Sequence, residues 1–274
     1  MLVTTTRPTV LGLAKRAWSS LFRAAVPMAL LFIIGYALMA GLDIAIQRLT
    51  PSLAIPTRDA LKEIITNNRR LPWLDVAKAV GLDVVVCILR ALITAPLAVA
   101  MHRFILLDET RRFYFVSRTT LRFSVWLVLL QVPTAILWWL ILFASGATGL
   151  VPLLVVLLIA LLLFLMQTLQ LLPAVATEER SPDTSARLET ALERAEGMFW
   201  LTLAALFLTF LPVIIVQAIA MRAFTKLATH APLIVPLARA AAGFIIVVLS
   251  ASLVSWLYSY GAYKKAAGAQ LEMA

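Results

Sequence analysis

The sequence predicts an all-α integral membrane protein, a bundle of six transmembrane helices with amphipathic helices on the cytoplasmic face. Of its 274 residues, 62% are hydrophobic and only 14% are charged, whereas a soluble domain is about half apolar and about a quarter charged. Six apolar runs are each about 20 residues long, enough to cross a hydrocarbon core. They lack the alternation of barrel strands, and a helix satisfies its own backbone hydrogen bonds in lipid.

The six runs divide one membrane domain, residues 1–274, into three pairs of spans. The predicted spans are residues 24–42, 79–101, 121–143, 150–172, 199–219 and 236–258. The order of surface helix, span and returning span recurs three times, which is weak evidence for three related hairpins. In the last span, Ala251, Ser255 and Ser259 follow the small-xxx-small spacing that permits close helix contact, within the bundle or between protomers.

The basic residues predict the orientation and one class of partner. Fourteen Lys and Arg residues fall on the side that holds both termini and eight on the other, so the positive-inside rule places both termini in the cytoplasm. The net charge is +10. Because the basic residues lie mostly beside the spans, anionic lipid headgroups are the expected partner. Nucleic acid is not, because no basic stripe is interleaved with exposed aromatic residues.

Three segments have the pattern of helices lying on the cytoplasmic face. In the first, residues 10–23, the apolar side chains predicted to share one face are Leu11, Ala14, Trp18, Leu21 and Phe22. The side chains predicted for the opposite face are Lys15, Arg16, Ser19 and Arg23. The second segment is 102–123. Such helices bury the apolar face in the headgroup region.

The third segment is an acidic helix between spans four and five. Ser181 is its expected N-cap and Gly197 its expected stop. The candidate surface for a protein partner comprises Glu178, Glu179, Glu189, Glu193 and Glu196. The alternative is a solvated helix face without a partner.

The same link resembles that of bacterial six-helix inner-membrane proteins, the YciC-like families and the membrane domain of glycerophosphoryl diester phosphodiesterases. The matching positions are Pro173, Glu178, Ala186, Gly197, Phe199 and Trp200. The segments "HRFILLDE" and "WLYSYGAYKK" are also similar. The resemblance implies an all-helical six-span unit in the bacterial inner membrane. It implies no catalytic residue, because the hydrolytic part of those phosphodiesterases is a separate domain.

Polar residues inside the spans form a candidate intramembrane site. Its predicted members are Asp83, Arg90, Gln131, Gln167 and Gln170. A charge at the depth of Arg90 costs about 2.5–3.5 kcal/mol on insertion scales and is usually paired or water-facing. Either Arg90 is a structural strut bonded to Asp83, Gln131 or helix carbonyls, or it forms the floor of an anion or headgroup site.

The remaining residues predict neither an enzyme nor a cofactor or metal site. His102 and His230 have no metal-ligand partner at helical spacing, and the single cysteine, Cys87, lies in an apolar run. The expected function is therefore a non-catalytic membrane scaffold, assembly factor or regulator. The alternative is a small transporter or lipid-handling protein with a site around Arg90, and a membrane enzyme comes third.

Overall fold

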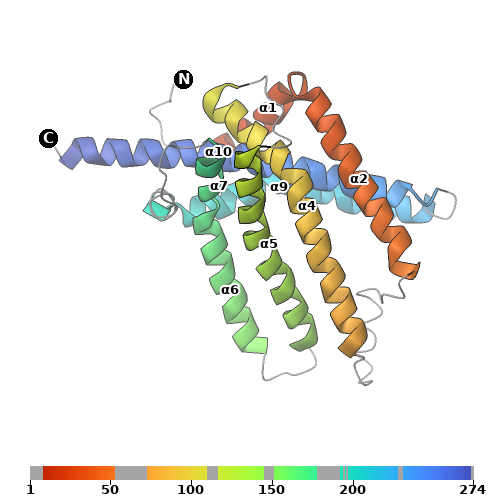
Figure 1. Ribbon diagram of the computed structural model, residues 1–274. Helices are drawn as coiled ribbons and strands as arrows, with labels where there is room; N and C mark the ends of the chain where they lie inside the picture. The colour runs from red at the N-terminus through yellow and green to blue at the C-terminus, as the bar shows by residue number, and fades with distance from the viewer. Residues whose placement is uncertain are drawn as a thin grey trace.

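The fold is helical throughout the part of the chain that the structure describes. The computed structural model describes residues 9–52, 73–109, 117–144, 151–177, 192–193, 195, 197–227 and 231–272. Its helices are α1 (Val10–Ala25), α2 (Ala29–Ser52), α4 (Trp73–Leu107), α5 (Arg118–Ala144), α6 (Val151–Thr168), α7 (Leu171–Ala176), α9 (Phe199–Leu227) and α10 (Ile234–Glu272). Figure 1 shows their arrangement.

Six of these helices are long and apolar enough to cross a membrane. The candidate segments are Ala29–Pro51, Leu74–Leu107, Arg118–Leu137, Pro152–Ala176, Phe199–Phe224 and Ile234–Lys264. The prediction of six long apolar helices is confirmed, and they indicate a multi-pass membrane protein. The first predicted span, 24–42, is displaced, because the turn Val26–Met28 separates α1 from α2. The helix α2 then continues beyond the apolar run to Ser52.

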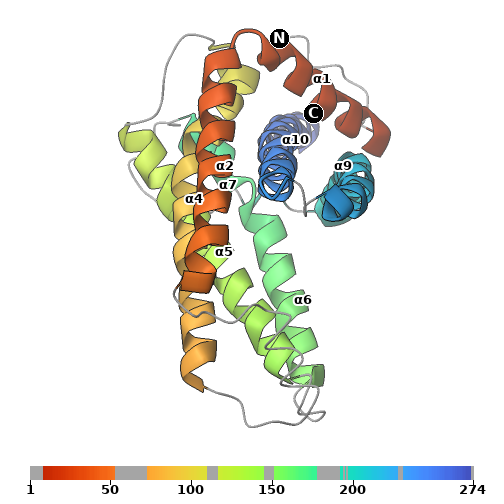
Figure 2. The same cartoon turned by 90° about the vertical axis from the view of Figure 1, so that its right-hand side faces the viewer.

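The long helices run in two directions. In both views, α2, α4, α5 and α6 run down the molecule, whereas α9 and α10 lie across them (Figures 1 and 2). The third hairpin, formed by α9 and α10, therefore runs in a different direction from the first two. The sequence pattern had suggested three related hairpins. Transmembrane helices are tilted by about 20° on average from the bilayer normal. In this arrangement, only one of the two sets of helices can therefore lie close to the normal of a single bilayer.

The helix α10 crosses the centre of the fold and packs against α1, α2, α4, α7 and α9. Small side chains line its contacts: Ala240, Ser252 and Ser255 are each fully buried. Such residues let two helix backbones approach closely. The small-residue spacing predicted for this helix therefore serves contacts within the chain at Ala251 and Ser255.

The main apolar core lies where α4 meets α5, α7 and α10. Leu97, Met101, Phe123, Leu171 and Val248 are among its fully or almost fully buried side chains. By contrast, only 6% of the residues in the most apolar part of the α6 span are buried, compared with 56% in that of α4. The outer side of α6 is thus an exposed apolar surface.

The helix α1, Val10–Ala25, has close to the predicted extent and packs one of its faces on the protein. Thr9 caps it through a hydrogen bond from the Gly12 amide to its hydroxyl. On the face that the sequence assigns to the headgroup region, Leu11 is 68% exposed and Phe22 is 69% exposed. Packing on α9 and α10 instead buries Leu13, Ala14, Ala17, Ser20 and Ala24. The small residues of this set fit against two neighbouring helices where large side chains would not.

The other predicted surface helices lie largely outside the described residues. Segment 102–123 begins as the end of α4 and finishes as the start of α5, with residues 110–116 outside the description. Of the acidic helix, only residues 192, 193 and 195 are described. Its predicted stop is confirmed, because Gly197 adopts φ +67°, which favours glycine.

Candidate functional site

An ion pair inside the apolar helices joins α2 to α4. The Arg90 Nη2 atom donates to the Asp43 Oδ1 atom at 2.6 Å. The Asp43 side chain is 5% exposed, whereas that of Arg90 is 41% exposed. The carboxylate is therefore the buried member of the pair, and the guanidinium covers it. Its partner is neither Asp83 nor Gln131, the two side chains that the sequence suggested.

Asp83 makes a different contact between helices. The indole Nε1 of Trp139, on α5, donates to the Asp83 Oδ2 atom at 2.7 Å. Trp139 is only 2% exposed. A buried indole N–H usually needs an acceptor, so Asp83 satisfies this donor where α4 packs on α5.

A third polar contact fixes the end of α4. Arg103 donates from Nε to Glu109 Oε2 at 2.8 Å and from Nη2 to Glu109 Oε1 at 3.1 Å. Its Nη1 donates to the Ala176 carbonyl, at the end of α7, at 3.1 Å. In the chain between Arg103 and Glu109, Asp108 adopts a positive φ of 56°. The planar guanidinium thus binds a carboxylate with two hydrogen bonds and also satisfies a helix-end carbonyl.

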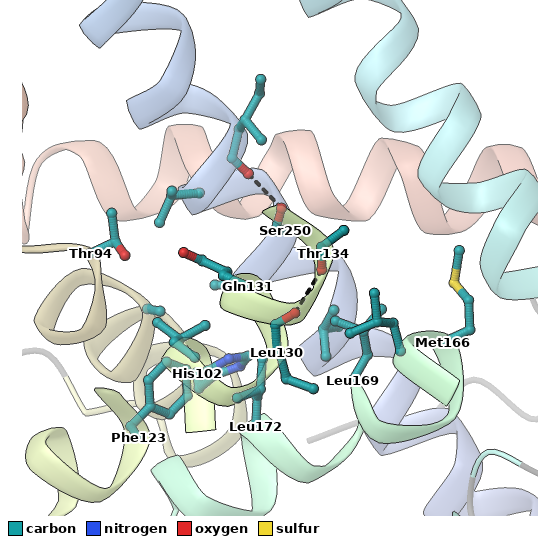
Figure 3. Close-up of a pocket in the computed structure, with 17 residues that line it drawn as sticks. Thr94, His102, Phe123, Leu130, Gln131, Thr134, Met166, Leu169, Leu172 and Ser250 are labelled. Carbon is teal, nitrogen blue, oxygen red and sulfur yellow. Dashed lines mark hydrogen bonds between the residues drawn. The ribbon is translucent and has the colours of Figure 1, made fainter. Parts of the chain in front are cut away.

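A cavity of about 410 Å³ lies between α4, α5, α6 and α10 (Figure 3). The wall is mostly aliphatic: α6 contributes Leu165 and Met166, α10 contributes Ile246 and Val254, and Leu172 follows from α7. None of the described lining residues is Lys, Arg, Asp or Glu. The volume is within the range of small-molecule sites, about 300–1,000 Å³.

The hydroxyl groups in this wall are bonded to their own helices. Thr94 donates to the Arg90 carbonyl at 2.8 Å, and Thr134 donates to the Leu130 carbonyl at 2.8 Å. Ser250 donates to Ile246 at 2.7 Å. Each hydroxyl has therefore used its proton, and its oxygen can still accept a hydrogen bond.

His102 occupies the other end of the cavity, against Phe123 (Figure 3). Its Nδ1 atom lies 2.7 Å from the Ser255 hydroxyl oxygen. The Ser255 hydroxyl also lies 2.8 Å from the Ala251 carbonyl oxygen, so it joins His102 to the backbone of α10.

Gln131 is the polar wall residue whose functional group is not engaged. It lines the cavity from α5, on the same side as Thr94, Thr134 and Ser250 (Figure 3). Its amide makes no hydrogen bond to any described residue. The amide therefore offers both a donor and an acceptor to a molecule in the cavity.

The structure disperses the remaining predicted site residues. Gln170 is 3% exposed at the turn before α7, and its Oε1 atom has no described partner. The side chain of Gln167 lies outside the description, as do Glu178, Glu179, Glu189 and Glu196. Glu193 is described and exposed. Of the candidates whose side chains the structure describes, Gln131 lines the cavity, and Asp83 and Arg90 join helices elsewhere.

Sequence reasoning missed the role of Asp43 and the contact between His102 and Ser255 at the cavity. The signal for Asp43 was present: the helical pattern continues past residue 42, which brings this acid inside the first long helix. The pairing of His102 with Ser255 joins residues 153 positions apart. No local sequence signal predicts such a contact.

The arrangement of the described polar groups suits the binding of a molecule in the cavity. The charged side chains described above contact other protein groups, and the cavity offers neutral hydrogen-bonding groups in an apolar wall. Among the described residues, no group of three or more His, Cys, Asp or Glu is placed to hold a metal ion.

Comparison of the chain with protein-family models, curated proteins and solved structures gave no match.

Proposed function

We propose that this chain is a multi-pass protein of the bacterial inner membrane that acts by binding, as a membrane scaffold, assembly factor or regulator. The observation that carries the proposal is the Arg90–Asp43 contact between α2 and α4. Residue Arg90 is the charge that a transport pathway would be expected to use. Its engagement with an almost fully buried carboxylate supports a structural role.

Two further observations support a protein that works at the membrane surface. The outer side of α1 exposes Leu11 and Phe22 together with the basic residues Lys15 and Arg23. Exposed apolar and basic side chains on one helix favour binding to a membrane with anionic headgroups. The resemblance to bacterial six-helix membrane proteins belongs to the same proposal.

The proposed protein partner binds the acidic link around Glu193. The test is native mass spectrometry of the full chain, purified from bacterial membranes in a mimetic that retains lipids. We expect a stoichiometric partner that is lost when Glu178, Glu179, Glu189, Glu193 and Glu196 are all changed to Lys. Reversal of Asp59 and Glu63, which would lie on the opposite side in the topology that we propose, is the matched control and should retain the partner.

A different result would favour the transporter or lipid-handling alternative. That result is the absence of a protein partner together with a retained anionic lipid or small molecule that is lost in Arg90→Leu. The variant must keep the elution volume of the unchanged protein, because loss of a structural contact would also lower binding.

The proposed topology has both termini in the cytoplasm, and it can be tested by cysteine labelling. In a Cys87→Ser background, single cysteines at residues 5 and 270 should react with a membrane-impermeant maleimide only after the cells are opened. A cysteine at Ala231, between α9 and α10, should react in intact cells if this hairpin crosses the membrane. Protection of Ala231→Cys would instead match the crosswise placement of α9 and α10 (Figure 1).

A further inference from the structure

The cavity between α4, α5, α6 and α10 has the composition of a site for an aliphatic chain. Its walls come from helices that run down the molecule, α4, α5 and α6, and from α10, which lies across them (Figure 2). The crossing keeps the α5–α6 pair apart from α10, and the intervening space is lined by side chains such as Leu127, Leu169 and Val247. Aliphatic side chains of this kind make favourable van der Waals contacts with an aliphatic chain.

The polar groups of the cavity define the ligand further. Gln131 offers an amide donor and acceptor, and the hydroxyl oxygens of Thr94, Thr134 and Ser250 add acceptors. Acceptors thus exceed donors, so the complementary ligand group is itself a donor, such as a hydroxyl. A carboxylate or phosphate would have no cation among the described lining residues and would be costly to bury.

The position of the cavity makes the bilayer a source of such ligands. Leu165 and Met166 line it, whereas Leu163 and Phe164, immediately before them on α6, are 41% and 53% exposed. The helix α6 thus has the cavity on one side and an exposed apolar surface on the other. In a bilayer, molecules dissolved in the hydrocarbon core would reach this surface directly.

We propose that this cavity binds an uncharged single-chain amphiphile, a lipid-like molecule with an aliphatic chain and a hydroxyl group held by Gln131. The proposal is independent of the scaffold function, since it concerns neither the acidic link nor the Arg90–Asp43 contact. Its test therefore leaves the search for a protein partner unaffected.

The location is tested with a long-chain alcohol that carries a diazirine in its chain. The full chain in detergent is irradiated with the probe, and the labelled peptides are mapped by mass spectrometry. We expect labelling at segments 94–102, 127–134 and 246–254. Val247→Phe and Thr134→Phe, which fill the cavity from different helices, should each remove most of this labelling.

The matched control is Val156→Phe, on the exposed side of α6. It should label like the unchanged protein. Gel filtration and thermal unfolding establish which variants are folded, and either cavity-filling variant is sufficient. If a folded cavity-filling variant keeps its labelling, or if exposed segments label as strongly as the cavity, the proposal is wrong.

The chemical class is tested by competition against the probe. The alcohol should compete better than the alkane or the fatty acid of the same length. Gln131→Leu should reduce the preference for alcohol over alkane by about fivefold, because a neutral hydrogen bond contributes about 1 kcal/mol. Stronger competition by the fatty acid, or an unchanged preference in Gln131→Leu, would contradict the proposed recognition.

Discussion

Arg90 of α4 and Asp43 of α2 form an unequal ion pair, in which a guanidinium that is 41% exposed covers a carboxylate that is 5% exposed. The Nη2–Oδ1 distance is 2.6 Å. The buried partner depends on the contact more than the exposed one does, because arginine can extend its head toward a polar phase. The two residues should therefore respond differently to substitution.

Arg90→Met should destabilise the protein more than Asp43→Asn. The first change leaves a buried carboxylate without its cation, whereas the second keeps a carbonyl oxygen that can accept a hydrogen bond from the guanidinium. We expect the Arg90→Met loss to be below the about 3–5 kcal/mol typical of fully buried pairs, because Arg90 is partly exposed. Thermal unfolding in one detergent measures both.

The double variant Arg90→Met/Asp43→Leu is the control for this prediction. With both charges removed, most of the lost stability should return, because no uncompensated charge remains. Equal losses for the two single variants, or a double variant with the sum of both losses, would show that the pair is not coupled in this way.

Asp83→Leu should destabilise the contact between α4 and α5. The change leaves the buried Trp139 N–H without this acceptor, at an expected cost of about 1–3 kcal/mol. Asp83→Asn keeps a carbonyl acceptor and should cost less. A cycle with Trp139→Phe separates this hydrogen bond from the other contacts of the two residues, and a coupling near zero would contradict the prediction.

The helices themselves were the most predictable part of this fold, for a physical reason. Lipid requires a continuous apolar run of sufficient length, and each such run is a local property of the sequence. The end of α2 was not predicted, because helical hydrogen bonding continues through Asp43 after the apolar run ends. An apolar run locates a helix but does not fix its last residue.

The contacts between helices could not be derived in the same way. Whether Asp83 meets Arg90 or Trp139 depends on which helices become neighbours, and the crosswise position of α10 is not encoded in any local period. The face of α1 that packs on α9 and α10 could not be derived from the sequence for the same reason. Its small residues pack inward around Ala17, although Leu11 and Phe22 are more hydrophobic. The cavity is formed where four helices meet, so it could not be predicted from the sequence of any one of them.

Arg103→Lys should loosen the end of α4 even though it keeps the charge. A lysine cannot form the two-point contact with Glu109 and at the same time reach the Ala176 carbonyl. Loss of one charge-assisted hydrogen bond, about 1.5–3 kcal/mol, should increase local opening. Tryptic cleavage after Arg111 and Arg112 should then be about tenfold faster, since cleavage follows the population of the open form.

The matched control for Arg103→Lys is Arg122→Lys, at an exposed position on α5. This change should leave the cleavage rate at Arg111 unaltered. Equal rates in the Arg103→Lys variant and the unchanged protein would mean that Glu109 does not hold this end of the helix closed.

Gly35→Ala should destabilise the packing of α2 on α4, whereas Gly41→Ala on the same helix should not. A Cβ atom at Gly35 would lie 2.5 Å from Leu97 Cδ1 and 3.0 Å from both Cδ2 and Cγ. Leu97 is 1% exposed and cannot easily move, so the expected cost is the about 1–3 kcal/mol of overpacking. At Gly41 a Cβ meets nothing within 4 Å, and alanine favours a helix over glycine by up to about 1 kcal/mol. Thermal unfolding should therefore shift in opposite directions, and Leu97→Ala should relieve part of the Gly35→Ala loss, which an additive double variant would disprove.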